Sequence, residues 1–214
     1  MRKTLITIFL LIALALALAA CGGDQNAPQP PSHPSTPSSG AEAGDDSLQQ
    51  LIKEATASPS AAAALNLGNA YAEQNRFSEA QRAYEDGLKI NPNDPTILSN
   101  LGVTLYQMGQ FNAAKERFEK VLKLRPDDAA TTYLLGATYL QMGDQQQAEA
   151  MFKKALAIDP TLPEAHFGLG TLYTLQGKKD LAIKEFETFL EGPPPQDPRA
   201  ITEAQRYLRQ LKGQ

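Results

Sequence analysis

Apolar and small residues recur along this chain at a fixed spacing of 34 residues. The clearest column is a Leu-Gly pair, which occurs at Leu67-Gly68, Leu101-Gly102, Leu135-Gly136 and Leu169-Gly170. Three further columns share this spacing: Ala80, Ala114, Ala148 and Ala182; Tyr84, Phe118, Phe152 and Phe186; and Pro92, Pro126, Pro160 and Pro194. Columns that share one period indicate an internal repeat, whose units bury their apolar stripes against each other.

The residue types predict two helices in each unit. The Gly of each pair and the Ala of the second column let two helix backbones approach, while the Leu and the aromatic residue fill the surrounding space. Between the helices we predict left-handed turn residues at Gly109, Gly143 and Gly177, with Asn75 in that role in the first unit. N-caps followed by a proline are predicted at Ser58-Pro59, Asp94-Pro95 and Asp197-Pro198.

These signals predict an all-α fold made of four helix-turn-helix repeats. We place the repeats at 61–94, 95–128, 129–162 and 163–196. Capping helices are expected at 46–60 and 197–214, because the first and last repeats need cover for their apolar faces. The inward positions predicted for the two caps are Leu48, Leu51 and Ile52, and then Ile201, Ala204, Tyr207, Leu208 and Leu211.

The columns resemble the tetratricopeptide-repeat (TPR) pattern over residues 61–196. The resemblance implies a right-handed superhelix whose first helices line a concave groove that binds other proteins. This chain departs from the pattern at the fourth position of the repeat, where the family often has Trp. Those positions hold Ala64, Leu98, Thr132 and His166.

The family's groove positions can be carried over to this chain. They are Leu65, Asn66, Asn69, Glu73, Ser99, Asn100, Val103, Tyr106, Gln107, Tyr133, Ala137, Leu140, Gln141, Glu164, Phe167, Thr171 and Thr174. The set contains no Lys or Arg, which disfavours the TPR subclass that grips a C-terminal carboxylate with Lys, Arg and Asn, although Asn69 and Asn100 match its asparagines.

We therefore expect the groove to bind an extended peptide or an amphipathic helix. Asn66, Asn69 and Asn100 would hold the partner's backbone, and the aromatic anchors would be Tyr106, Tyr133 and Phe167. The alternative for these aromatic residues is packing between repeats. Packing is the role that we expect for Tyr71, Tyr139 and Tyr173.

The N-terminus has the layout of a secretory signal. Arg2 and Lys3 precede an uncharged run that ends in Leu18-Ala19-Ala20-Cys21, and this tetrapeptide resembles the bacterial lipobox. The resemblance implies that 1–20 is a lipoprotein signal peptide and that Cys21 is lipidated with a diacylglycerol and, after cleavage, acylated at its new amine, palmitate being the expected type of acyl chain. The alternative is an uncleaved membrane anchor, for which the run is somewhat short of about 20 residues.

After Cys21 the chain is rich in Pro, Ser, Gly and Gln, and we predict a disordered tether over 21–45. Its extended reach is roughly 70 Å, so the partner is expected close to the membrane. His33 lies in this tether and is not expected to bind a metal. Some lipoproteins that stay in the inner membrane resemble one another in having Asp directly after the lipidated cysteine, whereas this chain has Gly22 there. In a host with two membranes, we therefore expect the protein on the outer membrane, facing the periplasm.

Charge and chemistry restrict the function classes. The net charge of −4 gives no basic face for nucleic acid. Only Cys21, His33 and His166 carry thiol or imidazole, and neither a catalytic triad, a phosphate-binding loop nor a metal cluster is recognisable, so we expect neither enzyme activity nor a cofactor.

Three function classes remain. The first is a membrane-anchored scaffold that aids the assembly of an envelope complex, with an architecture similar to the pilotin-type lipoproteins that assemble secretins. The second is an adaptor for cell-wall synthesis or hydrolysis enzymes. The third is a structural role through self-association.

Overall fold

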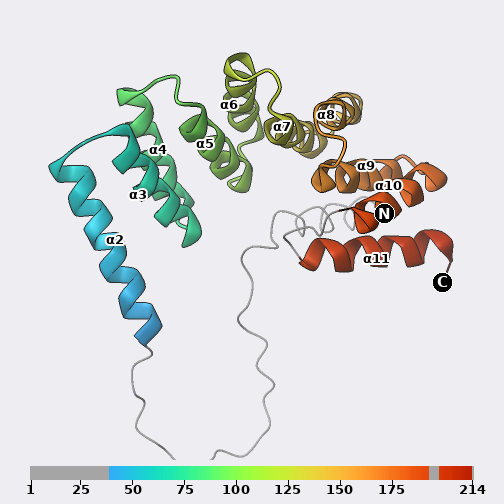
Figure 1. Ribbon diagram of the computed structural model, residues 1–214, viewed down its shortest axis with the longest axis horizontal. Coiled ribbons are helices and arrows are strands. Elements are labelled where there is room, and N and C mark those ends of the chain that lie inside the picture. Colours follow the sequence, from blue (N-terminus) through green and yellow to red (C-terminus); the bar gives the residue numbers. More distant parts are fainter. Residues whose placement is uncertain (1–38, 193–197, 214) are drawn as a thin grey trace, which may run out of the picture.

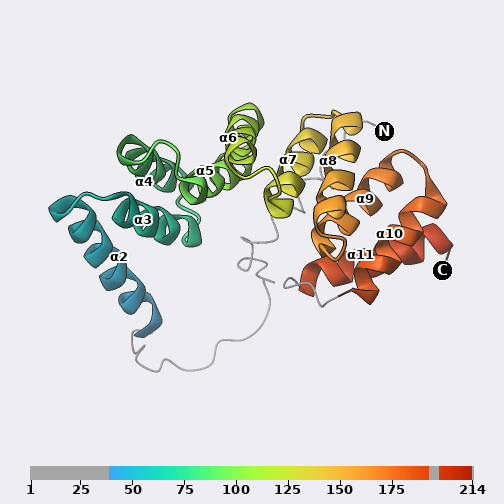
Figure 2. The same cartoon turned by 45° about the horizontal axis from the view of Figure 1, so that its top comes forward.

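The computed structural model describes residues 39–192 and 198–213. All regular structure in these ranges is helical, which confirms the all-α prediction. The helices are α2 (Ser39–Ala57), α3 (Ala61–Glu73), α4 (Phe77–Ile90), α5 (Pro95–Gln107), α6 (Phe111–Leu124), α7 (Ala129–Gln141), α8 (Gln145–Ile158), α9 (Pro163–Leu175), α10 (Lys179–Glu191) and α11 (Pro198–Lys212). They follow one another along an arch from α2 to α11, as two views show (Figures 1 and 2).

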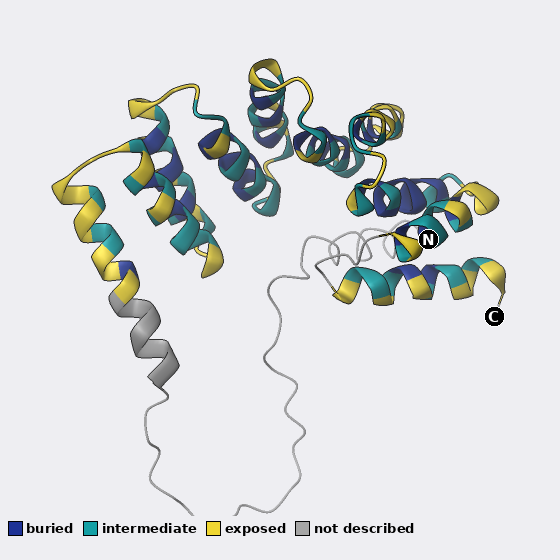
Figure 3. Ribbon diagram, in the orientation of Figure 1, coloured by how far each residue is buried: buried dark blue, intermediate teal, exposed yellow. Residues whose placement is uncertain are grey.

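In each helix pair, a glycine of the first helix packs closely against an aromatic ring of the second helix. A Cβ placed on Gly102 of α5 would lie 2.6 Å from Cε1 of Phe118 on α6, and one on Gly170 of α9 would lie 2.8 Å from Cε1 of Phe186 on α10. Phe118 and Phe186 are fully buried. Buried residues accordingly gather where neighbouring helices face each other (Figure 3). The predicted close approach of the two helices is confirmed.

The turns between the paired helices have the predicted backbone conformation. Asn75, Gly109, Gly143 and Gly177 have φ of 58°, 73°, 82° and 70°. Glycine adopts this left-handed region without the Cβ clash that other residues meet, and Asn tolerates it better than most. The first repeat therefore closes its turn with Asn75 where the others use Gly.

The predicted helix starts are correct at Asp94 and wrong at Ser58. Asp94 caps α5, since its Oδ1 accepts from the backbone N–H of Thr96 and Ile97, and Pro95 is the first helical residue. In α3 the cap is Ser60, whose Oγ accepts from the N–H of Ala63 at 3.1 Å. Ser60 directly precedes a run of strong helix formers, so the helix begins after Ser60 and not after Ser58. Asp197 lies outside the described residues.

The N-terminal helix α2 begins at Ser39, earlier than the predicted cap at 46. Residues 41–43, Ala-Glu-Ala, have high helix propensity, so the prediction of disorder is wrong for the last part of the tether. Leu48 is buried, as predicted, and Leu51 is half-buried. The predicted signal peptide, Cys21 and His33 lie outside the described residues.

The C-terminal helix α11 covers the last repeat. Its Tyr207 ring is stacked on Phe186 with the ring centroids 5.0 Å apart, and Ala204 is fully buried. Arg209 is exposed, and Lys212, which is also exposed, forms an ion pair with Glu187 of α10 at 2.7 Å. The predicted inward stripe of this helix is confirmed. In the part of the chain that the structure describes, no helix is both long and apolar enough to cross a bilayer.

Candidate functional site

The arch has an inner side that the first helices of the repeats form. Successive first helices, α3, α5, α7 and α9, contact one another, whereas contacts between successive second helices are fewer. Units of a curved stack lie closest on its concave side, so the first helices line that side (Figure 1). We call the inner face the surface of α3, α5, α7 and α9 that carries Asn66, Asn69, Asn100, Tyr106 and Tyr133.

An amide pair links the first two repeats on the inner face. Oδ1 of Asn69 on α3 accepts from the Tyr84 hydroxyl at 2.7 Å and from Nδ2 of Asn100 on α5 at 2.8 Å. Burial raises the pKa of Tyr84 to about 12, partly offset by an Asn100 side-chain contact, so this hydroxyl stays protonated and can donate. Both asparagines are half-buried and their positions are fixed by these bonds. Asn66, one turn away on α3, is exposed.

Two tyrosines from successive repeats lie further along the inner face. The Tyr106 ring packs edge-on against Phe111, with ring centroids 5.4 Å apart, and Tyr133 packs against Phe152 at 5.8 Å. Burial raises the pKa of both hydroxyls, and a Gln141 side-chain hydrogen bond partly offsets this for Tyr106. Electrostatic interactions with Tyr106 and Glu164 add to the rise in the pKa of Tyr133. We call Tyr106 on α5 and Tyr133 on α7, both half-buried, the tyrosine cluster.

Phe167 does not lie exposed on the inner face, and its prediction as an anchor is wrong. Only 8% of the residue is exposed, and its ring contacts Phe186 and Phe189 with centroids 5.6 and 5.3 Å away. Residue 189 occupies a column in which the earlier repeats have Gly87, Val121 and Ala155. Because residue 189 is a phenylalanine, its ring extends to the first helix and packs against Phe167, which becomes part of the core.

The other carried-over positions differ in exposure. Thr171 is buried and its hydroxyl donates to the carbonyl of Phe167 at 3.0 Å. Glu73 and Glu164 are exposed. The half-buried positions are Leu65, Ser99, Val103, Gln107, Ala137, Leu140, Gln141 and Thr174.

The three tyrosines predicted to be packing residues have that role. Tyr173 is buried and its hydroxyl donates to Glu149 at 3.2 Å. The Tyr139 hydroxyl lies 3.5 Å from Glu119, and Tyr71 packs against the core beneath the Arg76 guanidinium, which lies 4.7 Å from the ring centroid.

His166 is held inside its repeat. Its Nδ1 lies 2.7 Å from a carboxylate oxygen of Glu185, and its Nε2 lies 3.3 Å from the carbonyl oxygen of Pro160. The described residues contain no group of three or more His, Cys, Asp or Glu side chains arranged to hold a metal ion.

Paired helices with a 34-residue period place the chain in the class of helical-repeat proteins. Within that class, three tetratricopeptide-repeat family models match residues 68–109, 94–161 and 139–211, which together span most of the folded part. The chain is a tetratricopeptide-repeat protein, and the predicted TPR superhelix is confirmed. Proteins of this kind generally mediate protein–protein interactions.

Solved structures with the same fold include three bacterial proteins. MamA from Desulfovibrio magneticus RS-1 is 23% identical, with a TM-score of 0.65 over 71% of this chain and 86% of that one. A thermophilic TPR protein from Thermus thermophilus is 24% identical, with a TM-score of 0.61 over 71% and 80%. PilF from Pseudomonas aeruginosa is 20% identical, with a TM-score of 0.64 over 80% and 82%. No curated protein matches the sequence.

Proposed function

We propose that this protein is a membrane-anchored scaffold that binds a peptide or helix of an envelope protein on its inner face. In this role it aids the assembly of an envelope complex of the pilus or secretion type. The predicted lipidation of Cys21 holds it at the membrane, on the outer membrane facing the periplasm in a host with two membranes. Two or more acyl chains are enough for stable anchoring, so the repeats themselves need not touch lipid.

The amide pair of Asn69 and Asn100 is the observation that carries the binding proposal. Oδ1 of Asn69 already accepts two hydrogen bonds, which occupy both of its lone pairs. What the pair offers a partner is then the NH2 group of Asn69 as a donor and the carbonyl oxygen of Asn100 as an acceptor. One donor beside one acceptor matches a peptide unit of an extended chain, whose C=O accepts and whose N–H donates.

The tyrosine cluster supplies the apolar part of the proposed interface. Tyr106 and Tyr133 are already held by Phe111 and Phe152, so a partner would not have to immobilise their rings. Rigid aromatic side chains give contact area at low entropic cost, and this favours affinity. The cluster and the amide pair share α5, so a bound segment contacting both would cross at least three repeats.

The binding proposal is tested by introducing large, charged side chains on the inner face. In Asn66→Arg/Gln107→Arg both changes lie on first helices, and the matched control Asn112→Arg/Gln146→Arg makes the same replacements at exposed positions of second helices. Each protein is crosslinked in native membranes and purified. We expect the inner-face variant to lose an envelope protein that the control retains, with equal thermal stability of the two variants.

Equal capture by both variants would refute the inner face as the binding site. The captured protein also separates the two scaffold roles that the sequence leaves open. A secretin or pilus component supports the assembly role, whereas a cell-wall synthase or hydrolase supports the adaptor role and contradicts the assembly role.

The anchoring proposal has a separate test. Cys21→Ser is expected to abolish incorporation of labelled palmitate and to prevent signal cleavage at this site. Unchanged labelling would contradict lipidation at Cys21 while leaving the binding proposal standing.

A further inference from the structure

His166 lies where the third and fourth repeats meet. We call each contact between successive repeats a junction and number the junctions along the chain, so this is the third. Nδ1 of His166 lies 2.7 Å from a carboxylate oxygen of Glu185 on α10, and Nε2 lies 3.3 Å from the carbonyl oxygen of Pro160 in the turn between α8 and α9. Only 15% of the His166 side chain and 16% of the Glu185 side chain are exposed. Both ring nitrogens therefore face hydrogen-bond acceptors.

The protonation state of the ring decides whether both acceptors receive a hydrogen bond. A neutral imidazole has one N–H donor and one lone pair, whereas the imidazolium donates from both nitrogens. In the neutral ring, the stronger bond to the charged carboxylate of Glu185 keeps the proton on Nδ1. The lone pair of Nε2 then faces the carbonyl oxygen of Pro160, and the bond to the turn is lost. Only the protonated His166 bonds to α10 and to the turn at once.

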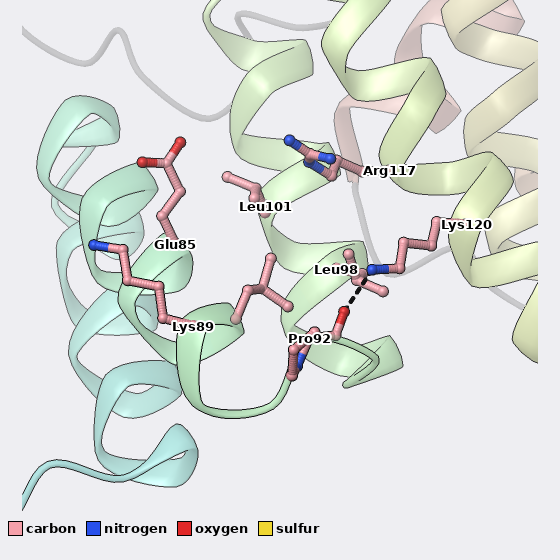
Figure 4. Close-up of a pocket in the computed structure, with 8 residues that line it drawn as sticks. Glu85, Lys89, Pro92, Leu98, Leu101, Arg117 and Lys120 are labelled. Atoms are coloured by element: carbon pink, nitrogen blue, oxygen red, sulfur yellow. Dashed lines mark hydrogen bonds between the residues drawn. The ribbon is translucent and has the colours of Figure 1, made fainter.

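The first junction binds the equivalent carbonyl with a different side chain. In the pocket between the first two repeats, Lys120 of α6 donates to the carbonyl oxygen of Pro92 at 2.6 Å (Figure 4). Pro92 and Pro160 hold the same position two repeats apart, but the position of Lys120 is taken by Thr188 at the third junction. Lysine ordinarily stays charged up to about pH 10, whereas histidine gains and loses its proton at about pH 6.5. The donor to the turn is thus permanent at the first junction and depends on a proton at the third.

The other charged groups around the ring titrate outside the range of histidine. In the turn, hydrogen bonds from the side chain and the backbone N–H of Thr161 hold the pKa of Asp159 below its usual value. Helix α8 contributes Glu149, Lys153 and Lys154, and the hydrogen bond between the first two lowers the pKa of Glu149 and raises that of Lys153. Helix α7, which also contacts α9, has no charged residue. The imidazole is therefore the group of this junction that titrates near neutral pH.

We propose that His166 forms a proton-dependent bridge, which holds the turn of the third junction while the ring carries two protons and releases it when the ring loses one. The contribution of the bridge to stability is complete at acidic pH and is lost as the pH rises through the titration of the ring. The earlier repeats hold Ala64, Leu98 and Thr132 at this position, so among the four repeats the fourth alone has a titratable ring there.

The bridge can act on the inner face through α9. Helices α7 and α9 contact each other, so release of the turn loosens the last part of the inner face. This consequence for partner binding rests on the proposed function, whereas the bridge itself is a property of the fold and is tested without a partner.

The first measurement locates the ring protons. The isotopically labelled full chain in detergent carries His33→Gln, which leaves His166 as its single histidine. NMR follows Nδ1 and Nε2 between about pH 5 and pH 9. We expect protons on both nitrogens at acidic pH and on Nδ1 alone once the ring has titrated. A neutral ring that keeps its proton on Nε2, or a protonation state that does not change in this range, would overturn the proposal.

The second measurement tests whether the ring proton holds the turn. The N–H of Leu162 donates to the carbonyl oxygen of Asp159 within the turn at 3.3 Å, and the N–H of Asp94 makes the equivalent bond at the first junction at 3.2 Å. After correction for intrinsic exchange, we expect the hydrogen-exchange protection of Leu162 to fall about fivefold or more as the ring titrates, because a hydrogen bond is lost. The protection of Asp94 should stay constant. An unchanged Leu162, or an equal fall at Asp94, would contradict the bridge.

Two variants separate the proton from the packing of the side chain. His166→Leu introduces the residue that the second repeat has at this position, and it should make the protection of Leu162 independent of pH. Glu185→Gln keeps an acceptor for Nδ1 but removes the charge that favours the imidazolium, so the fall in protection should move to lower pH. A pH dependence that either variant leaves unchanged would assign the effect to another group and overturn the proposal.

Discussion

The close approach of paired helices predicts that Gly102→Ala destabilises the protein, although alanine is the better helix former. In an unconstrained helix this change stabilises by about 1 kcal/mol. Here the new Cβ would lie 2.6, 2.9 and 3.0 Å from Cε1, Cδ1 and Cζ of Phe118. The Phe118 ring is fully buried, and the close packing of protein interiors leaves little room for a ring to move. Overpacking of this kind costs about 1–3 kcal/mol, and three ring atoms in close contact place the cost in the upper part of that range.

The net expectation is a loss of about 1–2 kcal/mol. For a folded domain of this size, that lowers the melting temperature by roughly 2–8 °C. The assay is thermal unfolding followed by circular dichroism at 222 nm, supported by urea titration of the same variants.

A double-mutant cycle isolates the contact. Phe118→Leu alone destabilises by roughly 1–2 kcal/mol because it shortens a buried side chain. In that background, Gly102→Ala should be close to neutral or stabilising, which gives a favourable coupling energy of about 1 kcal/mol or more. A Gly102→Ala protein as stable as the wild type, or a change that Phe118→Leu leaves unaltered, would refute the packing argument.

Three further predictions follow from single residues. Gly143→Ala is expected to lower the free energy of unfolding by about 1–2 kcal/mol because φ at this turn is 82°. Gly143→Asn should lower it less, because Asn75 has the same role in the first repeat. Urea titration compares the two variants, and equal stability would contradict the turn argument. Phe167→Ala should lower the free energy of unfolding by about 3–5 kcal/mol because it removes a buried ring, whereas Asn66→Ala should change it by no more than about 0.5 kcal/mol. Urea titration measures both, and a loss for Phe167→Ala as small as that for Asn66→Ala would show that Phe167 is exposed. The raised pKa of Tyr84, about 12, means that the folded state favours the protonated hydroxyl; its stability contribution is complete below the unfolded pKa near 10 and is lost as the pH rises through 12. Melting curves of the wild type should therefore fall more steeply between pH 10 and 12 than those of Tyr84→Phe, and parallel curves would contradict this.

The sequence was sufficient for the fold because several residue types repeat in one register. Each Leu-Gly pair, each aromatic residue and each turn residue constrains the same two helices, so the positions of Gly102 and Phe118 follow from their columns. The end of the tether was harder to predict. Helix α2 includes Ala41, Glu42 and Ala43, which are good helix formers. They adjoin a segment rich in glycine and proline, and the average composition of that region predicts disorder for all of it.

The candidate site was predictable only where a repeat resembles its neighbours. Tyr106 and Tyr133 are half-buried residues of first helices, whereas Phe167 is buried in the core against Phe189. A sequence signal for this was present, because Phe189 is the single large residue in a column of Gly87, Val121 and Ala155. The hydrogen bond between Asn69 and Asn100 connects two repeats, and no periodic pattern predicts such a bond.

The most direct test of the proposed function is site-specific photocrosslinking in native membranes. A benzoylphenylalanine replaces Gln141 on the inner face in one protein and Gln146 on a second helix in the other. The account predicts a discrete adduct with another envelope protein from position 141 and none of the same mass from position 146. Equal adducts from both positions, or an adduct that contains only a second copy of this chain, would contradict binding of an envelope partner on the inner face.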